Sequence, residues 1–411
     1  MRVAIVGSGG REHALAWALG QTAEVVVVPG NPGMTRAGVA CAPHLDAAGP
    51  VDLVVIGPEQ PLVDGLADKL RSTSVPVFGP GADGARLEGS KAHLKQVLVR
   101  AGVPTAASRA FPSGEEEAAE TFLRSLAGPW VVKTDGLAAG KGVLVADDVE
   151  AAVADVRAKL SGASFGDAGR TVVIEEGLTG REVSVLAICD GRTTDDAVVV
   201  LPVARDHKRV GDGDTGPNTG GMGAFSPVPA VPPDLAEQVL ETMVLPTLHT
   251  LASDGVDYRG VLYAGIMLTP DGPKLLEYNV RFGDPEAQVV LPRLYGDLAA
   301  LLASAAAGRV DPTAVSVRPE ACVGVVLAAP GYPGAPTTGA SIEGLDAAGP
   351  LVFCAGVAER AGRLVTAGGR VLCVAALGAD GQGARRAAYA AADHITFEGG
   401  TLRREDIAAT A

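Results

Sequence analysis

Residues 131–142 read VVKTDGLAAGKG and residues 275–286 read LLEYNVRFGDPE, and these two stretches decide the fold. The first carries Lys133 at the end of an apolar run and Lys141 inside a glycine-rich loop, and the second sets carboxylate and amide oxygens beside a guanidinium. Lysine and arginine neutralise phosphate oxygens, while hard oxygen donors suit Mg²⁺. Together the two stretches predict a site for a nucleoside triphosphate with its magnesium.

The spacing within each stretch sharpens this prediction. Lys133 lies on an expected strand and should be fixed, whereas Lys141 lies in a loop whose three glycines allow the backbone to approach phosphates. Glu277, Asn279 and Arg281 alternate along a second strand, which places their side chains on one face. An unremarkable glycine hairpin and a merely polar sheet face are the alternatives, and the paired lysines and the Glu, Asn and Arg set disfavour them.

Composition limits the partners and the compartment. The chain has 411 residues, 47% of them hydrophobic, and a formal charge of -14, so we expect about three domains and no nucleic-acid or membrane-surface partner. The five cysteines are scattered without paired spacing, which indicates buried thiols in a reducing compartment. With no apolar run of bilayer length and no signal-peptide pattern, we expect a cytoplasmic protein.

The N-terminal part has the pattern of a doubly wound parallel sheet. An apolar run enters a glycine turn and a helical stretch, and further apolar runs end in Pro or Gly turns. Ligands of such a sheet bind beyond the carboxyl ends of its strands. The expected strands are residues 3–6, 25–28, 53–56 and 75–78, and the expected helix is 11–19.

Two loops at that edge are candidate substrate sites. The turn containing Gly9 and Gly10 is half of a dinucleotide fingerprint, but Glu12 replaces its third glycine and no ribose-binding acid follows residues 25–28. A phosphate-bearing substrate is therefore favoured over NAD, and a tight turn without a ligand is equally compatible with this segment. Glu59 follows another strand and could accept hydrogen bonds from ribose hydroxyls, although an isolated Gly-Pro-Glu is more often an ordinary turn.

The next segments predict a helix and a small mixed lid. Ser90 is a plausible N-cap, and Lys91 and Lys95 share a helix face; we interpret Lys95 as part of a solvated lysine face. Residues 104–111 read as a connection. The lid is expected to contain helices at 113–126 and 150–160 and strands at 130–133 and 171–174.

Polar residues after the lid suggest nucleotide and substrate contacts. Glu175, Glu176 and Glu182 flank a strand end where backbone groups could pair with an adenine edge and Glu182 could hold ribose hydroxyls; surface charges are equally compatible with this spacing. Residues 205–209 and 216–223 combine polar groups with a loop too rich in glycine to be rigid, which is typical of a substrate gate rather than a disordered loop. His207 in that segment is more often a hydrogen-bonding residue than a base.

Taken in order, these motifs resemble the phosphoribosylamine-glycine ligase (glycinamide ribonucleotide synthetase) family of the ATP-grasp superfamily. The matching runs cover nearly the whole chain, and the two specific ones are DHKRVGDGDTGPNTGGMGAFSP and NVRFGDPE; the others are GSGGREHAL, GPEQPLV, LEGSKA, VVKTDGLAAGKGV, VIEEGLTGREVS, GYPG at 331–334 and GGRVLCV at 368–374. The resemblance implies that ATP, glycine and 5-phosphoribosylamine give glycinamide ribonucleotide, ADP and phosphate through glycyl phosphate, in de novo purine biosynthesis. Such chemistry needs positioning and charge neutralisation more than a nucleophilic side chain.

The resemblance also implies roles for individual residues. ATP would contact Lys91, Lys133, Lys141, Glu175, Glu176, Leu178 and Glu182, and Mg²⁺ or Mn²⁺ would bind Glu277 and Asn279. Arg281, Lys141, Asp206 and Lys208 would serve catalysis. The substrates would contact Gly9, Gly10, Glu59, Asp206, His207, Lys208, Asp284 and Glu286, with glycine near residues 206–208. Because residues 263–267 offer no further carboxylate, the other magnesium ligands should be water and phosphate.

The implied architecture is α/β with three parts: an N-terminal doubly wound domain (1–90), an ATP-grasp domain (91–312, its lid about 113–180) and a C-terminal α+β domain (313–411). The whole protein is expected to be a monomer. Two departures are the short crossover at 39–51, which leaves little room for a covering helix, and Ser8 where the family often has Asn. A biotin-attachment motif is absent from the C-terminal part. The alternatives are another ATP-grasp enzyme, disfavoured by the DHKR and GGMG runs, and a non-catalytic nucleotide-gated binder, disfavoured by the complete phosphoryl-transfer set.

Overall fold

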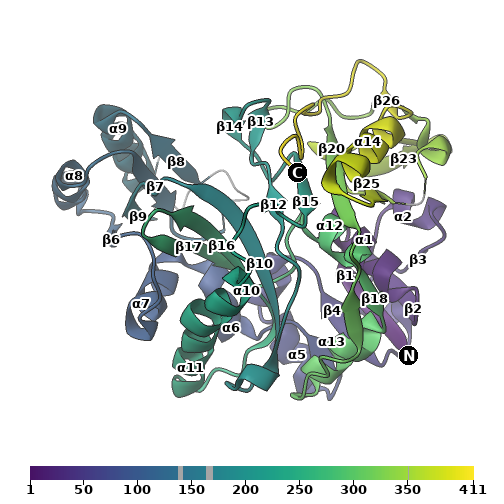
Figure 1. The fold of residues 1–411 in the computed structure, drawn as a ribbon, viewed down its shortest axis with the longest axis horizontal. Coiled ribbons are helices and arrows are strands. Elements are labelled where there is room, and N and C mark those ends of the chain that lie inside the picture. The colour runs from purple at the N-terminus through teal and green to yellow at the C-terminus, as the bar shows by residue number, and fades with distance from the viewer. Residues whose placement is uncertain (138–141, 163–169, 350) are drawn as a thin grey trace.

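The computed structural model describes residues 1–137, 142–162, 170–349 and 351–411, and Figure 1 shows their arrangement. In that view the lid, with α8 (Glu116–Ser125) and α9 (Val149–Leu160), lies at the left. The N-terminal strands and α14 (Gly381–Ala392) lie at the right. The strands of residues 205–226 run between these two sides, so both halves of the molecule can contribute to a site in the middle.

The N-terminal sheet is parallel, as its continuous apolar runs predict. Its order is β3-β2-β1-β4-β5, with β1 in the centre: β1 (Arg2–Gly7), β2 (Glu24–Pro29), β3 (Ala40–Cys41), β4 (Leu53–Ile56) and β5 (Val77–Phe78). The helices are α1 (Gly10–Leu19), α2 (Pro32–Arg36), α3 (Leu45–Ala48), α4 (Glu59–Val63), α5 (Leu66–Ser72) and α6 (Ala82–Gly89). The crossover at 39–51 holds only the short edge strand β3 and the four-residue α3, in line with its length.

The segment after α6 carries the chain from this sheet to the lid. Helix α7 (Lys91–Ala101) begins at Ser90, whose side chain accepts a hydrogen bond from the His93 amide, so the predicted N-cap is confirmed. The Asp135 carboxylate accepts hydrogen bonds from Ser90 Oγ and the Ala92 amide, which ties the start of α7 to the lid loop.

The lid is a four-stranded antiparallel sheet with two helices and its own hydrophobic cluster. The strand order is β6-β9-β7-β8: β6 (Ser108–Pro112), β7 (Trp130–Thr134), β8 (Val143–Ala146) and β9 (Thr171–Glu176). The prediction that residues 104–111 are only a connection is wrong, because Ser108–Pro112 forms an edge strand that pairs with β9. Pairing with a strand far along the chain leaves no signal in so short a segment.

The central sheet is antiparallel and supplies the floor below the lid. Its order is β11-β10-β16-β17: β10 (Arg181–Asp190), β11 (Val198–Val200), β16 (Arg259–Thr269) and β17 (Gly272–Asn279). Helical turns η2 (Asp195–Ala197) and η3 (Leu240–Val244) and helices α10 (Leu235–Val239) and α11 (Leu245–Ser253) accompany it. The sheet places β17, with its polar face, beside the lid strand that carries Lys133.

Residues 205–223, called the gate below, belong to two sheets. Strands β13 (Arg209–Gly211) and β14 (Thr215–Asn218) form a hairpin, while β12 (Arg205–Asp206) and β15 (Gly223–Ser226) pair with each other. Strand β15 also pairs with β20 (Ala321–Ala328), so the gate is anchored on the C-terminal sheet β12-β15-β20-β25-β22. The other strands of that sheet are β22 (Val352–Cys354) and β25 (Arg370–Gly378).

The remaining C-terminal elements pack around this sheet or, like α13 (Leu298–Ala306), against β10 and β16 of the central sheet and β5 of the N-terminal sheet. They are α12 (Ala287–Val290), η4 (Leu291–Arg293), β18 (Leu294–Gly296), α13 (Leu298–Ala306), β19 (Val315–Val317), β21 (Ile342–Glu343), η5 (Leu345–Ala347), β23 (Val357–Arg360), β24 (Arg363–Thr366) and β26 (Thr396–Phe397). The largely apolar runs at 322–327, 351–354 and 370–375 correspond to β20, β22 and β25. Among the described ranges, no helix combines the length and apolar character needed to cross a membrane.

Candidate active site

One cavity of about 550 Å³ lies where the lid, the central sheet, the N-terminal sheet and the gate meet. Many charged side chains line it beside apolar ones, and they come from distant parts of the chain. Its charged and amide-bearing lining includes Arg11, Glu59, Glu88, Lys91, Lys133, Glu175, Glu176, Glu182, Asp206, Lys208, Asn218, Glu277, Asn279, Arg281, Asp284, Glu286 and Arg370. Leu178 also lines it. The structure thus brings together most of the residues that the sequence marked.

At the lid end, a buried carboxylate lies between two lysines. Glu175 is 2% exposed; its Oε1 is 3.0 Å from Lys133 Nζ and its Oε2 is 3.2 Å from Lys95 Nζ. Burial disfavours the charge of Lys133, but Glu175 and Glu277 raise the pKa of that lysine above its usual value. Lys133 therefore stays positively charged where it can meet a phosphate.

The interpretation of Lys95 as a solvated lysine is wrong. The ammonium is buried and donates a hydrogen bond to Thr105 Oγ1 at 2.8 Å, besides its ion pair with Glu175. Burial lowers the pKa of Lys95 to about 8, against the opposing effect of Glu175. The sequence signal was present, because residues four apart share a helix face, and the face that carries Lys91 points into the cavity.

The metal prediction rests on β17. Glu277 and Asn279 both line the cavity, and Glu277 Oε2 lies 3.6 Å from Lys91 Nζ. Burial would raise the pKa of Glu277, but the charges of Lys91 and Lys133 lower it to about 2, so the carboxylate is ionised. No group of three or more His, Cys, Asp or Glu residues in the described parts of the chain is placed to hold a metal. A carboxylate and an amide oxygen beside a phosphate-sized space fit Mg²⁺, which commonly takes its remaining ligands from phosphate and water.

Arg281 follows the same strand and is held by two acids. Its Nε lies 3.2 Å from Glu59 Oε2, and its Nη2 lies 2.9 Å from Glu88 Oε1. The same Nη2 donates to Asn279 Oδ1 at 3.3 Å. Glu88 was missed from the sequence although it precedes the Ser90 cap by only two residues; its other oxygen accepts a hydrogen bond from the Val280 amide at 2.8 Å.

The gate contributes a second charged group. The Lys208 ammonium pairs with Glu182 and lies 3.8 Å from Asp206 Oδ1. The Asp206 side chain is 5% exposed, and burial raises its pKa to about 7 although Lys208 opposes this effect. Below it, Glu286 Oε1 accepts hydrogen bonds from Tyr263 OH at 2.9 Å and Ser184 Oγ at 3.2 Å.

His207 lies between these two gate residues in the sequence but does not line the cavity. Successive side chains of an extended segment point to opposite sides, so Asp206 and Lys208 face the cavity while His207 is buried with its ring 6.0 Å from that of Phe225. Burial lowers its pKa to about 4, which keeps the imidazole neutral.

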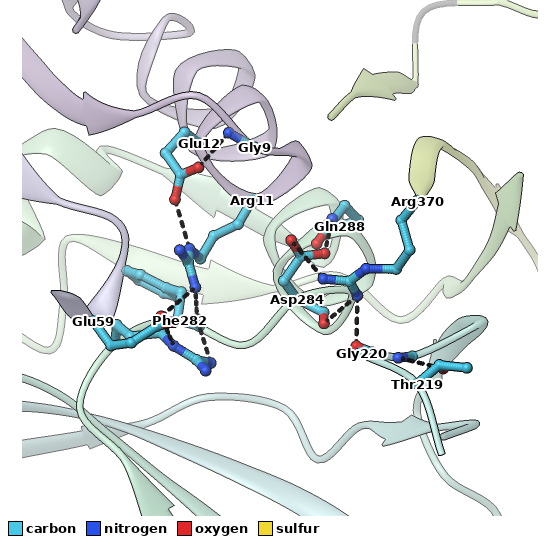
Figure 2. A network of polar contacts seen from close by, with 12 residues as sticks. Gly9, Arg11, Glu12, Glu59, Thr219, Gly220, Phe282, Asp284, Gln288 and Arg370 are labelled. Carbon is cyan, nitrogen blue, oxygen red and sulfur yellow. Dashed lines mark hydrogen bonds and ion pairs between the residues drawn. The ribbon is translucent and has the colours of Figure 1, made fainter. Parts of the chain in front are cut away.

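The glycine turn of the N-terminal sheet makes its contacts with the protein itself. The Gly9 amide donates to Glu12 Oε2 at 2.6 Å, and Arg11 Nε donates to Glu12 Oε1 at 2.6 Å (Figure 2). A Cβ at Gly7 would come within 2.5 Å of Glu12 Cγ, and one at Gly57 would overlap the same side chain. Gly9 and Gly10 do not line the cavity, whereas Arg11 does and donates to the Phe282 carbonyl at 3.3 Å.

Lys141 lies outside the described residues; Leu137 and Gly142, which border the undescribed stretch 138–141, line the cavity. Asp284 lies at the opposite end from the lid, close to Gly9, and receives Arg370 from the C-terminal sheet (Figure 2). Sequence reasoning assigned no role to Arg370. The one feature of the sequence that could have identified Arg370 was its position in the GGRVLCV run.

Comparison with known families matches most of the chain. Three family models match consecutive parts: the N domain of phosphoribosylglycinamide synthetase at residues 1–88, its ATP-grasp (A) domain at 89–287 and its C domain at 322–410. The chain is 45% identical to phosphoribosylamine-glycine ligase of Rhizobium meliloti, covering 98% of this chain and 97% of that protein. It is 48% identical to the ligase of the same name from Caulobacter vibrioides, with the same coverage.

Solved structures show the same relation. The crystal structure of phosphoribosylamine-glycine ligase from Thermotoga maritima superposes with a TM-score of 0.86 at 39% identity, covering 99% of this chain and all of that one. The biotin carboxylase domain of Hydrogenobacter thermophilus 2-oxoglutarate carboxylase, solved with MgADP and bicarbonate, gives a TM-score of 0.71 at 15% identity, covering 97% and 91% of the two chains. The second likeness concerns the fold alone.

Proposed function

The chain belongs to the phosphoribosylglycinamide synthetase family, and from that premise we infer that it joins glycine to 5-phosphoribosylamine at the expense of ATP. The products are glycinamide ribonucleotide, ADP and phosphate, in purine biosynthesis. One observation in the structure supports this best: Lys91, Lys133, Glu277, Asn279 and Arg281 converge on one cavity from the lid, α7 and the end of β17.

The reaction has two steps. A carboxylate oxygen of glycine attacks the γ-phosphorus of ATP, and ADP leaves with the electron pair of the broken P–O bond. The amine nitrogen of phosphoribosylamine then attacks the acyl carbon of glycyl phosphate, loses a proton, and phosphate departs. Both steps gain most from fixed positive charge and orientation, which the residues of this cavity supply.

In the first step, Lys91 and Lys133 would meet the nucleotide phosphates and Arg281 would contact the transferred group. Lys141, which lies outside the described residues, is proposed as a further phosphate contact. The strand end with Glu175, Glu176 and Leu178 would receive the adenine, and Glu182 the ribose. Glu277 and Asn279 would hold Mg²⁺ or Mn²⁺, which neutralises phosphate charge when bound.

The two other substrates divide the rest of the cavity. Glycine would lie against Asp206 and Lys208, at the gate, where buried charges of both signs suit an amino acid. Phosphoribosylamine would lie toward the N-terminal sheet, against Glu59, Asp284 and Glu286. Gly9 and Gly10 would shape that end of the cavity from behind these residues.

The direct test measures phosphate release from ATP with Mg²⁺ and glycine, with and without freshly generated 5-phosphoribosylamine, while mass spectrometry follows the product. Stoichiometric phosphate and glycinamide ribonucleotide with all substrates present is the expected result. Phosphate release without ribonucleotide, or no turnover by folded protein, would contradict it.

The cellular compartment and the oligomeric state are also part of the proposal. All five cysteines are free thiols, which suits the reducing cytoplasm, and the expected oligomeric state is a monomer. Sedimentation of the purified protein tests the oligomeric state; a concentration-independent dimer would contradict the second part.

A further inference from the structure

Two C-terminal motifs have no place in the reaction as derived above. They are GYPG at 331–334 and GGRVLCV at 368–374. The first supplies Tyr332 and the second supplies Arg370, and both side chains bind the same gate residue, Gly220. The Gly220 amide donates a hydrogen bond to Tyr332 OH at 3.0 Å, and Arg370 Nη1 donates to the Gly220 carbonyl at 2.5 Å. The C-terminal domain therefore binds both polar backbone groups of one gate residue.

Arg370 also binds the turn after the metal-site strand. Nη1 donates to the Asp284 carbonyl at 2.8 Å, and Nη2 lies 3.3 Å from Asp284 Oδ2 (Figure 2). Gln288 Nε2 donates to the other oxygen of the same carboxylate at 2.8 Å. A planar guanidinium can serve a carboxylate and two carbonyls at fixed angles, which a lysine ammonium cannot do equally well. Arg370 thus joins the gate to Asp284.

The local packing keeps these two side chains in place. A Cβ at Gly369 would overlap the ring of Tyr332, so glycine at this position allows the ring to lie against the backbone next to Arg370. The Arg370 carbonyl accepts a hydrogen bond from the Gly356 amide at 3.1 Å. Gly369 is therefore explained by the approach of Tyr332, whereas a Cβ at Gly368 would lie 3.1 Å from Gly356 Cα.

The contacts continue from Gly220 into the cavity. Thr219, its neighbour, donates from its amide at 2.7 Å and from Oγ1 at 2.8 Å to the Lys208 carbonyl. On the other side of Arg370, Asp284 lines the end of the cavity next to the N-terminal sheet. One cluster of hydrogen bonds therefore links the gate, the C-terminal motifs and the end of the cavity assigned above to phosphoribosylamine.

We propose that Tyr332 and Arg370 form a latch that holds the gate against Asp284 and so positions the second substrate, the phosphoribosyl amine, for attack on the acyl phosphate. They are positioning residues for the amine-transfer step and not for formation of glycyl phosphate. This inference rests on the proposed function, and the experiment separates the two.

Hydroxylamine can replace the amine substrate as a probe. Its nitrogen attacks the acyl carbon of glycyl phosphate, phosphate leaves, and glycine hydroxamate forms without any phosphoribosyl group. Hydroxamate formation from ATP, Mg²⁺ and glycine therefore reports the first step, whereas ribonucleotide formation reports both steps. The variants are Arg370→Met, Arg370→Lys and Tyr332→Phe.

For Arg370→Met we expect the KM for phosphoribosylamine to rise by roughly 10- to 100-fold, as loss of a charge-assisted hydrogen bond implies, with hydroxamate formation within about twofold of wild type. Arg370→Lys should recover part of the loss. Tyr332→Phe, which removes one neutral hydrogen bond, should shift the same KM by roughly three- to tenfold. Arg385→Met is the matched control, because Arg385 also donates to two carbonyls, those of Glu405 and Ile407, without reaching the gate.

The outcomes are distinct. If wild type forms neither hydroxamate nor ribonucleotide, the proposed function fails and the latch with it. If wild type is active and Arg370→Met slows both reactions equally, or leaves the amine KM unchanged, the latch is refuted while the function stands. Circular dichroism checks folding of each variant, and Tyr332→Phe, which deletes a single oxygen, decides the case should Arg370→Met be misfolded.

Discussion

Replacing Asp206 by asparagine should stabilise the protein more at pH 8 than at pH 5. The Asp206 side chain is 5% exposed, and the pKa of its carboxyl in the folded protein is about 7, against a usual value of 3.8. Between these two values the folded state binds one more proton than the unfolded state, so this group makes stability fall as the pH rises. Asparagine does not titrate, and the variant lacks this loss.

The size of the effect follows from the two pKa values. The cost of ionising Asp206 in the folded state grows by about two pKa units between pH 5 and pH 8, which corresponds to roughly 2.5 kcal/mol at 1.36 kcal/mol per unit. The stability difference between Asp206→Asn and wild type should therefore increase by that amount over this range. Lys208 remains in both proteins, and its pairing with Glu182 is common to them.

Urea unfolding of both proteins at pH 5 and pH 8, without ligands, measures this double difference. Asp271→Asn makes the same chemical change in an exposed turn and should show no such dependence. An equal stability difference at the two pH values would refute the reasoning, because it would mean that Asp206 is ionised without cost. A difference that grows toward pH 5 would refute it as well.

Three other substitutions test the remaining charged groups. Glu277→Gln should lower kcat by roughly 10²- to 10³-fold with the circular dichroism spectrum unchanged, because a metal-binding carboxylate is lost; near-normal turnover at saturating Mg²⁺ would remove Glu277 from the metal site. Glu88→Gln should lower the free energy of unfolding by roughly 2 kcal/mol, since Arg281 loses a buried ionic partner, and an unchanged urea midpoint would contradict that assignment. Lys95→Met should raise the KM for ATP by roughly tenfold, because Lys133 is then left as the only lysine on Glu175; an unchanged KM would make Lys95 purely structural.

Local pattern was sufficient for much of the fold. The apolar runs at 3–6, 25–28 and 53–56 became β1, β2 and β4, because three or four buried residues in succession satisfy a strand covered on both faces. The Ser90 cap was equally local, since the hydrogen bond that defines it spans three residues.

The contacts between residues of the site could not be predicted from local pattern in the same way. Arg281 meets Glu88, 193 residues earlier in the chain, and Gly220 meets Arg370, 150 residues later, so neither pair leaves a periodic or neighbouring signal. Lys95 was misjudged for a related reason. Its spacing showed which helix face it shares with Lys91, but whether that face meets water or Glu175 depends on how the lid packs on α7.

The Glu12 side chain has a consequence for how this sequence can vary. It occupies the volume that Cβ atoms at Gly7 and Gly57 would need, while its two oxygens hold the Gly9 amide and Arg11. A larger residue at either glycine is excluded while Glu12 remains, and loss of Glu12 alone leaves the buried Arg11 with the more distant Glu59, 3.9 Å away, as its ionic partner. Substitutions at Gly7, Glu12 and Gly57, which lie in two separate loops, are therefore tolerated only in combination. No single substitution can convert this turn into a dinucleotide-binding turn, or the reverse.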